Sequence, residues 1–568
     1  MKFVARIVCF SIPPVLTTAL FVLFFSDAFA QSGPAQSNDV IESNRAVADA
    51  NDVAYCAGSR VTPLELLPTD HWAYEELKKL WIQGLVDSFF FSSRPASRFD
   101  IAELLISLED TGSKAAGSPS MERLLREFSR EIRELRKASA QKGDDGEGGD
   151  RYKETPFLYQ RKEPGTDFRL SIYADAIADN ADQENIELKD GSRAGVRAWA
   201  LIRPGIVLFE DIYVGKITHG QLYGEELFSL KDVLIFSDRF YVSLRAPFLD
   251  LELGRDKVRW GPGYTGTLLL SDGAPTYTIL YAGKTLGRRV KVSAVSGILD
   301  PEEGKYLAGH RIEIAPWNRI QLGFAETAIY HSQFVEPLYA ISLIPFTLVE
   351  RILHRDSRYT GIDDPLRNNV SVSADFVVRA HSGVSFYGEL MVDDWAEETS
   401  KRPTKLAYQL GTRASLPAGR RNVNAIAELT RVWNYTYSTS YSHFYDRDQS
   451  HQGVPLGYLL GPDSKRIFLE LSYDASRDFE LGLTWDETLK GEGSLQNPWR
   501  EEMGSVDADK LSGIVETRRA LSPFVRWLPR DNFLVEASAG LKQIKNENHA
   551  KSGTESSALF SFRLAARW

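Results

Sequence analysis

The sequence predicts an all-β fold: a transmembrane antiparallel β-barrel of about 16–18 strands, preceded by a small α-helical domain. Three observations support this fold class. Apolar residues recur at every second position over 155–568, the last strand has one wholly apolar face, and an export signal is followed by no long apolar helix. Together they indicate an exported chain that crosses a membrane with strands joined by short turns.

The first 30 residues have the pattern of a secretory signal peptide. Lys2 and Arg6 lie at the start of an apolar run, and Ala28-Phe29-Ala30 fits a small-residue cleavage site. A membrane anchor is the alternative, but the Pro13-Pro14 pair interrupts the run, which is shorter than the roughly 20 residues of a spanning helix. The polar, small residues of 31–60 predict a flexible segment after the signal.

The net charge and the cysteine content of the chain limit the partners, disulfides and metal sites that can be expected. The 568-residue chain carries 67 Lys and Arg against 77 Asp and Glu, a formal net charge of −10. Nucleic acid is therefore not an expected partner, because phosphate binding needs basic patches. Removal of the signal would take away Cys9 and leave Cys56 alone, so neither an internal disulfide nor a cysteine-rich metal site is expected.

Residues 61–110 have helical periodicity. A first helix is expected after Asp70 and ends at Gly84, and a second begins near Ser97. A third helix, with Pro119 in its first turn, lies within 111–154, a stretch that closes in a charged, Gly-rich linker.

The last strand, SALFSFRLAARW, separates a membrane barrel from a soluble β-sandwich. One face carries Phe560 and Phe562 among other apolar residues, and the opposite face carries Arg563 and Arg567. A strand of about 10 residues that is apolar outside and polar inside is typical of outer-membrane barrels. The alternative is a soluble sandwich whose core face is this apolar one. A barrel this wide has a lumen that must hold water, loops or a plug.

Within 61–110, the segments DHWAYEELKKLWIQGLV and SRPASRFDIAELL resemble a single S-layer-homology module. The resemblance implies that Arg98, in the second helix, lies in a site for cell-wall polymer, and Trp72 and Arg94 are further candidates for that site. The sequence departs from the module at Asp100, where Glu is usual, and in having a single copy. The alternative is structural: the aromatic residues form the core of a helical domain that packs beneath the barrel.

The stretch GRDKVRWGPGYTGTLLLSDGAP (254–275) combines a rigid Trp-Gly-Pro-Gly bend with charges and three leucines. It resembles a segment of the Wzi-type capsule-assembly family of outer-membrane proteins. Later segments resemble further blocks of that family in the same order: GHRIEIAPWNRIQLGFAETAIY (309–330), FYGELMVDDW (386–395), ELTRVWNYTYS (428–438) and PLGYLLGPDS (455–464). The resemblance implies a barrel of about eighteen strands with a helical region at its periplasmic end. It also implies a lectin that holds capsular polysaccharide at the cell surface.

Catalytic motifs such as G-x-S-x-G, H-E-x-x-H and the Walker loop are not found, so neither enzyme activity nor a metal or cofactor is expected. A polysaccharide site needs none of these, because sugar faces stack on aromatic rings and hydroxyls bond to charged side chains. The candidates for polysaccharide binding are Arg255, Lys257, Arg259, Trp260, Tyr264, Asp272 and Trp433. The alternative for the aromatic residues is an interfacial girdle, and for the charged residues a polar lumen wall.

The sequence thus predicts an outer-membrane protein, with its helical domain in the periplasm, that retains capsular or other surface polysaccharide without catalysis. Expected partners are that polysaccharide, outer-membrane lipid, the barrel assembly machinery and, through the S-layer-like module, peptidoglycan or another wall polymer. The alternatives are a wall-anchored porin for small solutes and a structural tether to the wall. Retention predicts a lumen blocked by inward loops, and 254–275 is expected as a structured loop near the lumen mouth rather than a hairpin tip.

Overall fold

The computed structural model describes residues 62–87, 89–110, 118–139, 157–180, 187–188, 192–216, 233–341, 344–354, 368–395, 401–419, 421–439, 446–530 and 532–568. The chain divides into two units, Met1–Ala54 and Tyr55–Trp568, and all of the described residues belong to the second. The expected signal peptide (1–30) and flexible segment (31–60) lie outside the described residues.

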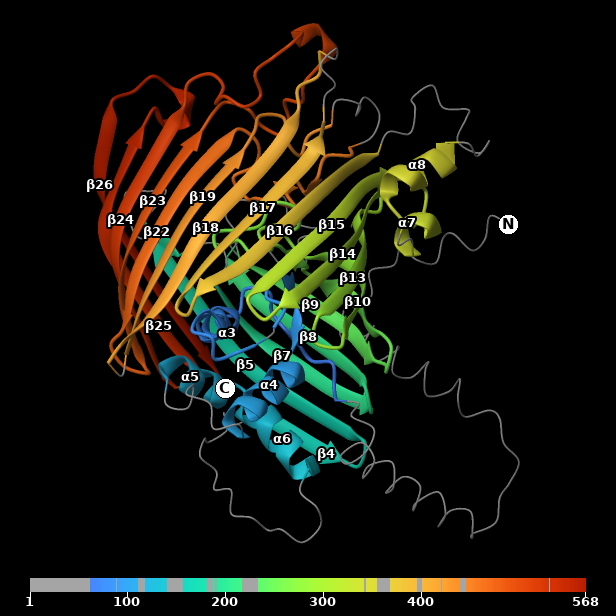
Figure 1. The fold of residues 1–568 in the computed structure, drawn as a ribbon, viewed down its shortest axis with the longest axis vertical. Coiled ribbons are helices and arrows are strands. Elements are labelled where there is room, and N and C mark those ends of the chain that lie inside the picture. Colours follow the sequence, from blue (N-terminus) through green and yellow to red (C-terminus); the bar gives the residue numbers. More distant parts are fainter. Residues whose placement is uncertain are drawn as a thin grey trace. The chain divides into compact units, whose positions relative to one another are not determined.

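Eighteen antiparallel strands of the described residues form a closed barrel (Figure 1). In chain order these strands are β5 (Thr166–Asp179), β7 (Arg193–Arg203), β8 (Ile206–Lys216), β9 (Val233–Arg245), β10 (Asp250–Asp256), β12 (Tyr277–Leu286), β13 (Val290–Asp300), β14 (Lys305–Trp317), β15 (Ile320–His331), β16 (Asn369–His381), β17 (Val384–Asp394), β18 (Lys405–Ala418), β19 (Arg421–Val432), β22 (Ser464–Asp474), β23 (Phe479–Lys490), β24 (Glu516–Arg530), β25 (Phe533–Lys545) and β26 (Thr554–Arg567). The last strand closes the barrel on the first, with Ser561 opposite Asp179 and Arg567 opposite Tyr173. The predicted fold class is confirmed.

The two ends of the barrel differ in their connections. At the short-turn end, tight turns join the strands, and Gly287 (φ +62°) and Gly383 (φ +93°) supply left-handed conformations there. At the long-loop end, connections run to the length of 257–276 and 433–463. Small elements accompany the barrel: β4 (Tyr159–Glu163), β6 (Glu187–Leu188), β11 (Arg259–Trp260), β20 (Ser450–His451), β21 (Val454–Pro455), η1 (Glu501–Met503) and η2 (Glu547–His549).

The wall of the barrel has an apolar outer face and a polar inner face. On β26, Phe560 and Phe562 are exposed on the outside, whereas Arg563 points inward and bonds to Asp175 of β5 at 2.7 Å. This is the division of faces that the last strand predicts, and it is the surface that a bilayer requires of a barrel.

Among the helices of the described residues, none is long and apolar enough to cross a membrane.

The N-terminal segment (62–139) folds around an apolar core of its own. It contains β1 (Leu66–Leu67), α3 (Ala73–Ile82), β2 (Ser93–Arg94), β3 (Ala96–Ser97), α4 (Arg98–Asp110), α5 (Pro119–Glu127) and α6 (Ser129–Ser139). Ser118 caps α5 by accepting a hydrogen bond from the Met121 amide at 3.2 Å. The third expected helix is divided into two at Phe128. Next to this break, the Glu127 carbonyl accepts a hydrogen bond from the Arg98 guanidinium, 3.1 Å away.

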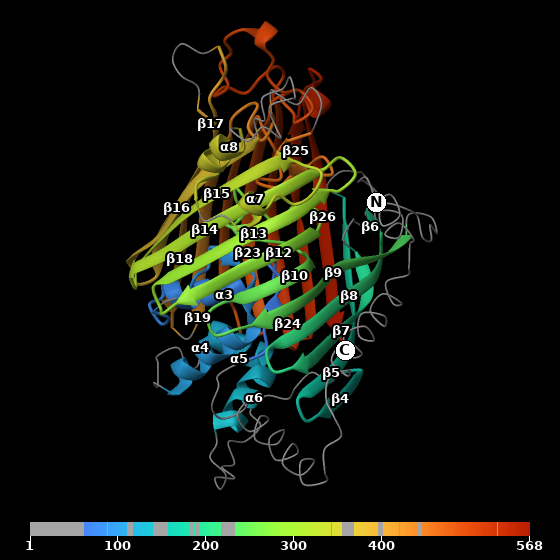
Figure 2. The same ribbon diagram turned by 90° about the vertical axis from the view of Figure 1, so that its right-hand side faces the viewer.

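This segment does not simply pack beneath the barrel, as the structural alternative expected, because α3 lies inside the ring of strands (Figures 1 and 2). The Trp81 carbonyl accepts a hydrogen bond from Arg379 of β16, and Gln83 bonds to Ser415 of β18 at 3.0 Å. The inward side chains of the strands hold α3 there, which hydrophobic periodicity alone does not reveal.

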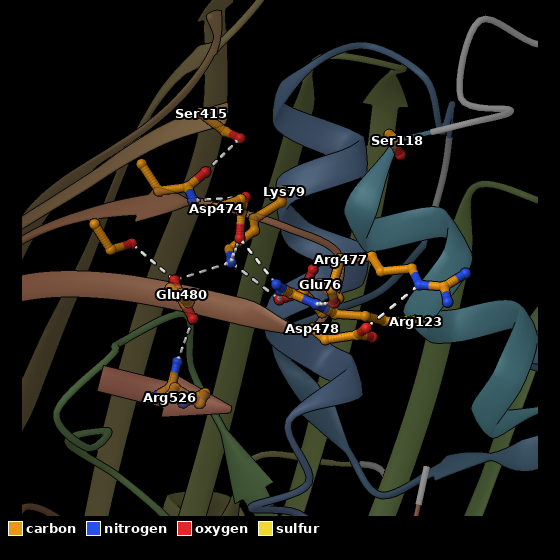
Figure 3. A network of polar contacts seen from close by, with 12 residues as sticks. Glu76, Lys79, Ser118, Arg123, Ser415, Asp474, Arg477, Asp478, Glu480 and Arg526 are labelled. Atoms are coloured by element: carbon orange, nitrogen blue, oxygen red, sulfur yellow. Dashed lines mark hydrogen bonds and ion pairs between the residues drawn. The ribbon is translucent and has the colours of Figure 1, made fainter. Parts of the chain in front are cut away.

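A cluster of charges joins the segment to the C-terminal strands (Figure 3). Arg123 of α5 donates to Glu76 of α3 at 3.1 Å and to Asp474 of β22 at 3.2 Å. Lys79 contacts Glu76 at 2.9 Å and Glu480 of β23 at 3.5 Å. Two helices of the N-terminal segment and two C-terminal strands therefore share one ion-pair network.

Two further helices, α7 (Pro337–Ile341) and α8 (Phe346–His354), lie against the outside of the barrel wall (Figures 1 and 2). Tyr339 of α7 stacks on the outward ring of Tyr330 at 4.5 Å. At the start of α8, the Phe346 amide donates to Glu326 at 3.0 Å, and the Phe346 ring lies 4.6 Å from His310. The hairpin thus covers a polar His–Glu pair on the outer wall.

Candidate functional site

The connection 257–276, called the lumen loop, crosses the inside of the barrel. It leaves β10 and returns at β12, yet its middle is held by carboxylates on the opposite wall. Glu428 of β19 accepts hydrogen bonds from the Tyr264 and Thr265 amides at 2.6 and 2.9 Å. Glu389 of β17 accepts from the Leu268 and Leu269 amides at 3.1 and 3.2 Å. Four backbone donors inside the lumen are therefore paired, as buried amides must be.

The rigid bend of the lumen loop is fixed by local contacts. Arg259 forms an ion pair with Asp272 at 2.7 Å and donates to the Gly263 carbonyl at 2.6 Å. Gly261 has φ +125°, and an added Cβ would collide with the Glu389 carboxylate. Only glycine therefore fits at this point of the crossing.

The lumen loop meets the N-terminal segment in the middle of the barrel. Strands β11 and β2 pair, with Arg259 opposite Arg94 and Trp260 opposite Ser93. The Gly261 amide adds a hydrogen bond to the Ser92 carbonyl at 2.8 Å. An inward loop from the long-loop end and the segment from the short-turn end thus form one continuous block across part of the lumen.

A second inward connection, 433–463, packs on the first. Tyr437 donates to the Leu268 carbonyl at 2.8 Å, and Gln449 donates to the Leu269 carbonyl at 2.6 Å. Two tyrosines of this connection, Tyr437 and Tyr458, are fully buried in the same apolar core as the leucines of the lumen loop. The three leucines of the lumen loop, Leu268, Leu269 and Leu270, thus belong to the core of the block.

The block fills the lumen unequally. Against β14 and β16 it leaves the inward Arg311 and Asp375 side chains only 1% and 2% exposed. Where the first and last strands of the barrel meet, Arg197 of β7 and Arg563 of β26 keep 27% and 39% exposure, although both also face inward. The loops and helices therefore pack tightly on one half of the wall and loosely on the other.

A cavity of about 700 Å³ occupies the looser side. We call it the free half-lumen. It is bounded by inward residues of β5, β7–β9, β18, β19 and β22–β26 on one side, and by α3 and the lumen loop on the other. Three arginines of its wall are paired with carboxylates: Arg193 with Asp238 at 2.9 Å, Arg197 with Asp211 at 2.8 Å, and Arg526 with Glu480 at 2.7 Å.

The candidates for polysaccharide binding fall into two groups. Lys257, Tyr264 and Asp272 line the free half-lumen. Burial, then the nearby Glu470 that accepts its hydroxyl at 3.0 Å, raises the pKa of Tyr264 well above its ordinary value. Burial alone would raise the pKa of Asp272, but Arg259 holds it below the usual value.

The other candidates lie within or beside the block. Trp260 is 1% exposed and belongs to the apolar core. Arg259 is buried in its contacts with the loop. Arg255 donates to the Thr276 carbonyl at 3.1 Å, and Trp433 is half-buried with its amide bonded to the Leu406 carbonyl at 2.9 Å.

The candidates for wall binding are largely taken up by contacts within the protein. Arg98 is buried, 2.6 Å from Glu131 and 2.8 Å from Glu127. Arg94 donates to the Thr69 carbonyl at 2.7 Å and lies over the Tyr74 ring. Trp72, stacked on His71, is half-buried and lines the free half-lumen. Burial lowers the pKa of His71 to about 4, against the opposing effect of Glu127.

The residues that sequence reasoning missed are the inward carboxylates Glu389 and Glu428. Each is an isolated acid at an inward position of a strand, flanked by apolar residues. That pattern is compatible with any polar lumen wall, and nothing local indicates that each acid caps backbone amides more than a hundred residues away. In the described part of the chain, no group of three or more His, Cys, Asp or Glu is placed to hold a metal.

Comparison with known families decides the identity of this barrel. The model of the capsule assembly protein Wzi family matches residues 237–559, more than half of the chain. The chain belongs to the Wzi family. The predicted resemblance is thus confirmed, and the matched residues include the lumen loop. The match does not extend to residues 61–110, where an S-layer-homology module is predicted.

The fold is shared with a solved structure of the same family, whereas two other solved structures superpose less well. The Wzi protein of Escherichia coli, an outer-membrane protein involved in group 1 capsule assembly and a carbohydrate-binding β-barrel, superposes with a TM-score of 0.55 and 15% identity over 88% of this chain and 98% of that one. OccD3 of Pseudomonas aeruginosa gives 0.39 and 8% over 71% and 91%. OmpT of Vibrio cholerae gives 0.33 and 10% over 73% and 100%. No curated protein matches the chain in sequence.

Proposed function

We propose that this Wzi-family barrel is an outer-membrane, non-catalytic protein that binds and retains capsular or other surface polysaccharide. One observation of the structure carries the proposal beyond family membership. The lumen loop crosses the barrel and pairs with the N-terminal segment, so over that part of the lumen a solute meets a packed core of leucines and tyrosines where a general porin has an aqueous channel.

The polysaccharide would be held by side chains of the lumen loop and of the connection beside it. Among the residues selected from the sequence, Lys257, Tyr264 and Asp272 have the most favourable surroundings because they line a cavity. Arg255, Arg259, Trp260 and Trp433 would then act by shaping the loop rather than by touching sugar, since they lie in or beside the packed block.

The proposed location follows from the wall. The apolar outer surface suits outer-membrane lipid, and a barrel of this kind would be inserted by the barrel assembly machinery. The short-turn end, with the N-terminal segment, would face the periplasm. Binding of peptidoglycan or another wall polymer there would use the half-buried Trp72 before the buried Arg94 and Arg98.

The proposal is tested by removing the protein and by reconstituting it. Deletion in the source cell should release polysaccharide into the medium, and the purified chain should bind that polysaccharide. In a planar bilayer, the intact chain should show low conductance, and replacement of residues 261–271 by a short Gly-Ser linker should raise it. Large, steady conductance of the intact chain without polysaccharide binding would instead identify a porin.

A further inference from the structure

The free half-lumen is large enough to be a binding site rather than a packing defect. Its volume, about 700 Å³, lies within the roughly 300–1,000 Å³ of ligand pockets. Packing defects in cores are small and apolar, whereas this cavity has Tyr173, Tyr264 and Trp72 among many charged neighbours.

The charges around the cavity nearly cancel. Its lining includes twelve Asp or Glu and eleven Lys or Arg side chains. Most of the arginines already contact a carboxylate of the protein, as in Arg197–Asp211 at 2.8 Å and Arg563–Asp175 at 2.7 Å. An acidic ligand would have to displace one of these carboxylates or reach Lys257, which donates to the Asp272 carbonyl at 3.0 Å, or Arg567, 3.8 Å from Glu127. Either way it would lose its own hydration in a cavity whose acids already outnumber its cations.

A neutral sugar meets no such obstacle. Each paired guanidinium or carboxylate keeps hydrogen-bonding capacity that a hydroxyl can use, because an ionised carboxylate accepts about four bonds and a guanidinium donates five. Aromatic rings give the sugar faces a surface on which to stack. An apolar ligand, in contrast, would bury charges without bonding to them.

We propose that the free half-lumen binds a neutral segment of polysaccharide, with Tyr264, Arg197 and Asp211 among the contacting side chains. This inference rests on the proposed function. It adds where the ligand binds, inside the barrel beside the block, and the charge of the ligand, neutral rather than acidic.

Two oligosaccharides of equal length test the charge class. Isomaltoheptaose is neutral, and heptagalacturonate carries a carboxylate on each sugar. Calorimetric titration of the purified full-length chain should give a Kd at least tenfold lower for isomaltoheptaose. Tighter binding of heptagalacturonate, or no binding of isomaltoheptaose, would overturn the proposal.

The place is tested by closing the cavity after the protein has folded. In a chain with Cys9 and Cys56 replaced by Ser, Ala565→Cys places a thiol on the inward face of β26, in the lining of the cavity. Ser552→Cys, in the exposed turn before β26, is the matched control. Modification with fluorescein maleimide, followed by mass spectrometry, should abolish isomaltoheptaose binding at position 565 and leave it unchanged at 552.

The outcomes separate this inference from the proposed function. If the native surface polysaccharide and isomaltoheptaose both still bind after modification at 565, retention stands and the cavity is not the site. If the thiol at 565 cannot be modified in the folded protein, the cavity is closed to ligands and the inference fails. If the native polysaccharide binds neither before nor after modification, the proposed function fails with it.

Discussion

At the residue scale, Arg98 is the position where a polymer-binding role and a structural role predict different results. Its guanidinium bonds to Glu131 and Glu127 in a buried site. Arg98→Met keeps the apolar stem but removes the guanidinium from both buried carboxylates, leaving Glu131 with Arg130 alone, so we expect the N-terminal segment to lose about 3–5 kcal/mol of stability. Native-state proteolysis of residues 62–139 measures this loss.

The control for Arg98 is Arg136, which is exposed and pairs with Glu109 at 2.8 Å. Arg136→Met should cost less than about 1 kcal/mol, because solvent screens an exposed pair. Equal protease sensitivity of the two variants would contradict a structural role. Wall-polymer binding that disappears in Arg98→Met without any change in proteolysis would restore the polymer site.

The carboxyl group of Asp448 makes the stability of the connection 433–463 depend on pH. Burial, then the neighbouring Asp446, raises the pKa of Asp448 to about 7. The folded connection therefore holds a proton that the unfolded chain releases near pH 4, so its stability falls as pH rises from about 4 through 7.

The variant Asp448→Asn removes this titration and keeps an acceptor for the Thr439 amide, which lies 2.6 Å from the carboxylate. We expect slower hydrogen exchange of residues 446–463 than in the unsubstituted chain at pH 8, and no difference at pH 4 once intrinsic rates are corrected. Asp507→Asn, on an exposed residue, is the control. A difference of equal size at both values of pH would show that titration is not the cause.

At the element scale, the α7–α8 hairpin shields a polar pair from the outer surface. Phe346 is fully buried against His310, whose partner Glu326 lies 3.2 Å away. Phe346→Ala should cost about 3–5 kcal/mol of local stability, because it leaves a cavity and loosens the cover over these polar groups. Leu348→Ala, on the exposed side of the same helix, should cost far less. Protease cleavage within 344–354 distinguishes the two, and equal cleavage would contradict the packing.

The elements also show why some of this fold was predictable and some was not. Strand β26 could be assigned from alternation, because its two faces meet different surroundings at every second residue. The apolar run 337–349 has no alternation that would show which surface it covers. Its helices cover the outer wall through contacts with Tyr330 and Glu326, and these contacts depend on where β15 lies.

The same limit applies to the candidate site. The Trp-Gly-Pro-Gly bend indicates a rigid loop, but its route across the lumen depends on Glu389 and Glu428, from strands more than a hundred residues further on. Trp260 was selected as a sugar-stacking candidate because it is aromatic and beside charges. The pairing of β11 with β2, which no local pattern encodes, places its ring in the core.

At the scale of the whole molecule, the barrel and its internal block are joined by charge. Arg123 connects Glu76 in the N-terminal segment to Asp474 in the wall and also donates to the Arg477 carbonyl at 2.7 Å (Figure 3). Removing the arginine from such a buried ion pair is strongly destabilising, because the carboxylates remain buried without their partner. It holds the short-turn end of the block in position.

Arg123→Ala should therefore loosen the block without unfolding the barrel. We expect flickering conductance in a planar bilayer, in place of the steady low conductance of the unsubstituted chain, together with faster proteolysis of residues 62–139. Arg477→Ala is the matched control, since that side chain is 59% exposed and its ion pairs with Glu122 and Asp478, at 3.9 and 3.4 Å, are long and screened by solvent. It should leave both measurements nearly unchanged. Identical conductance traces for the two variants would contradict this role of the ion-pair network. The apolar core and the β2–β11 pairing would then hold the block in place without it.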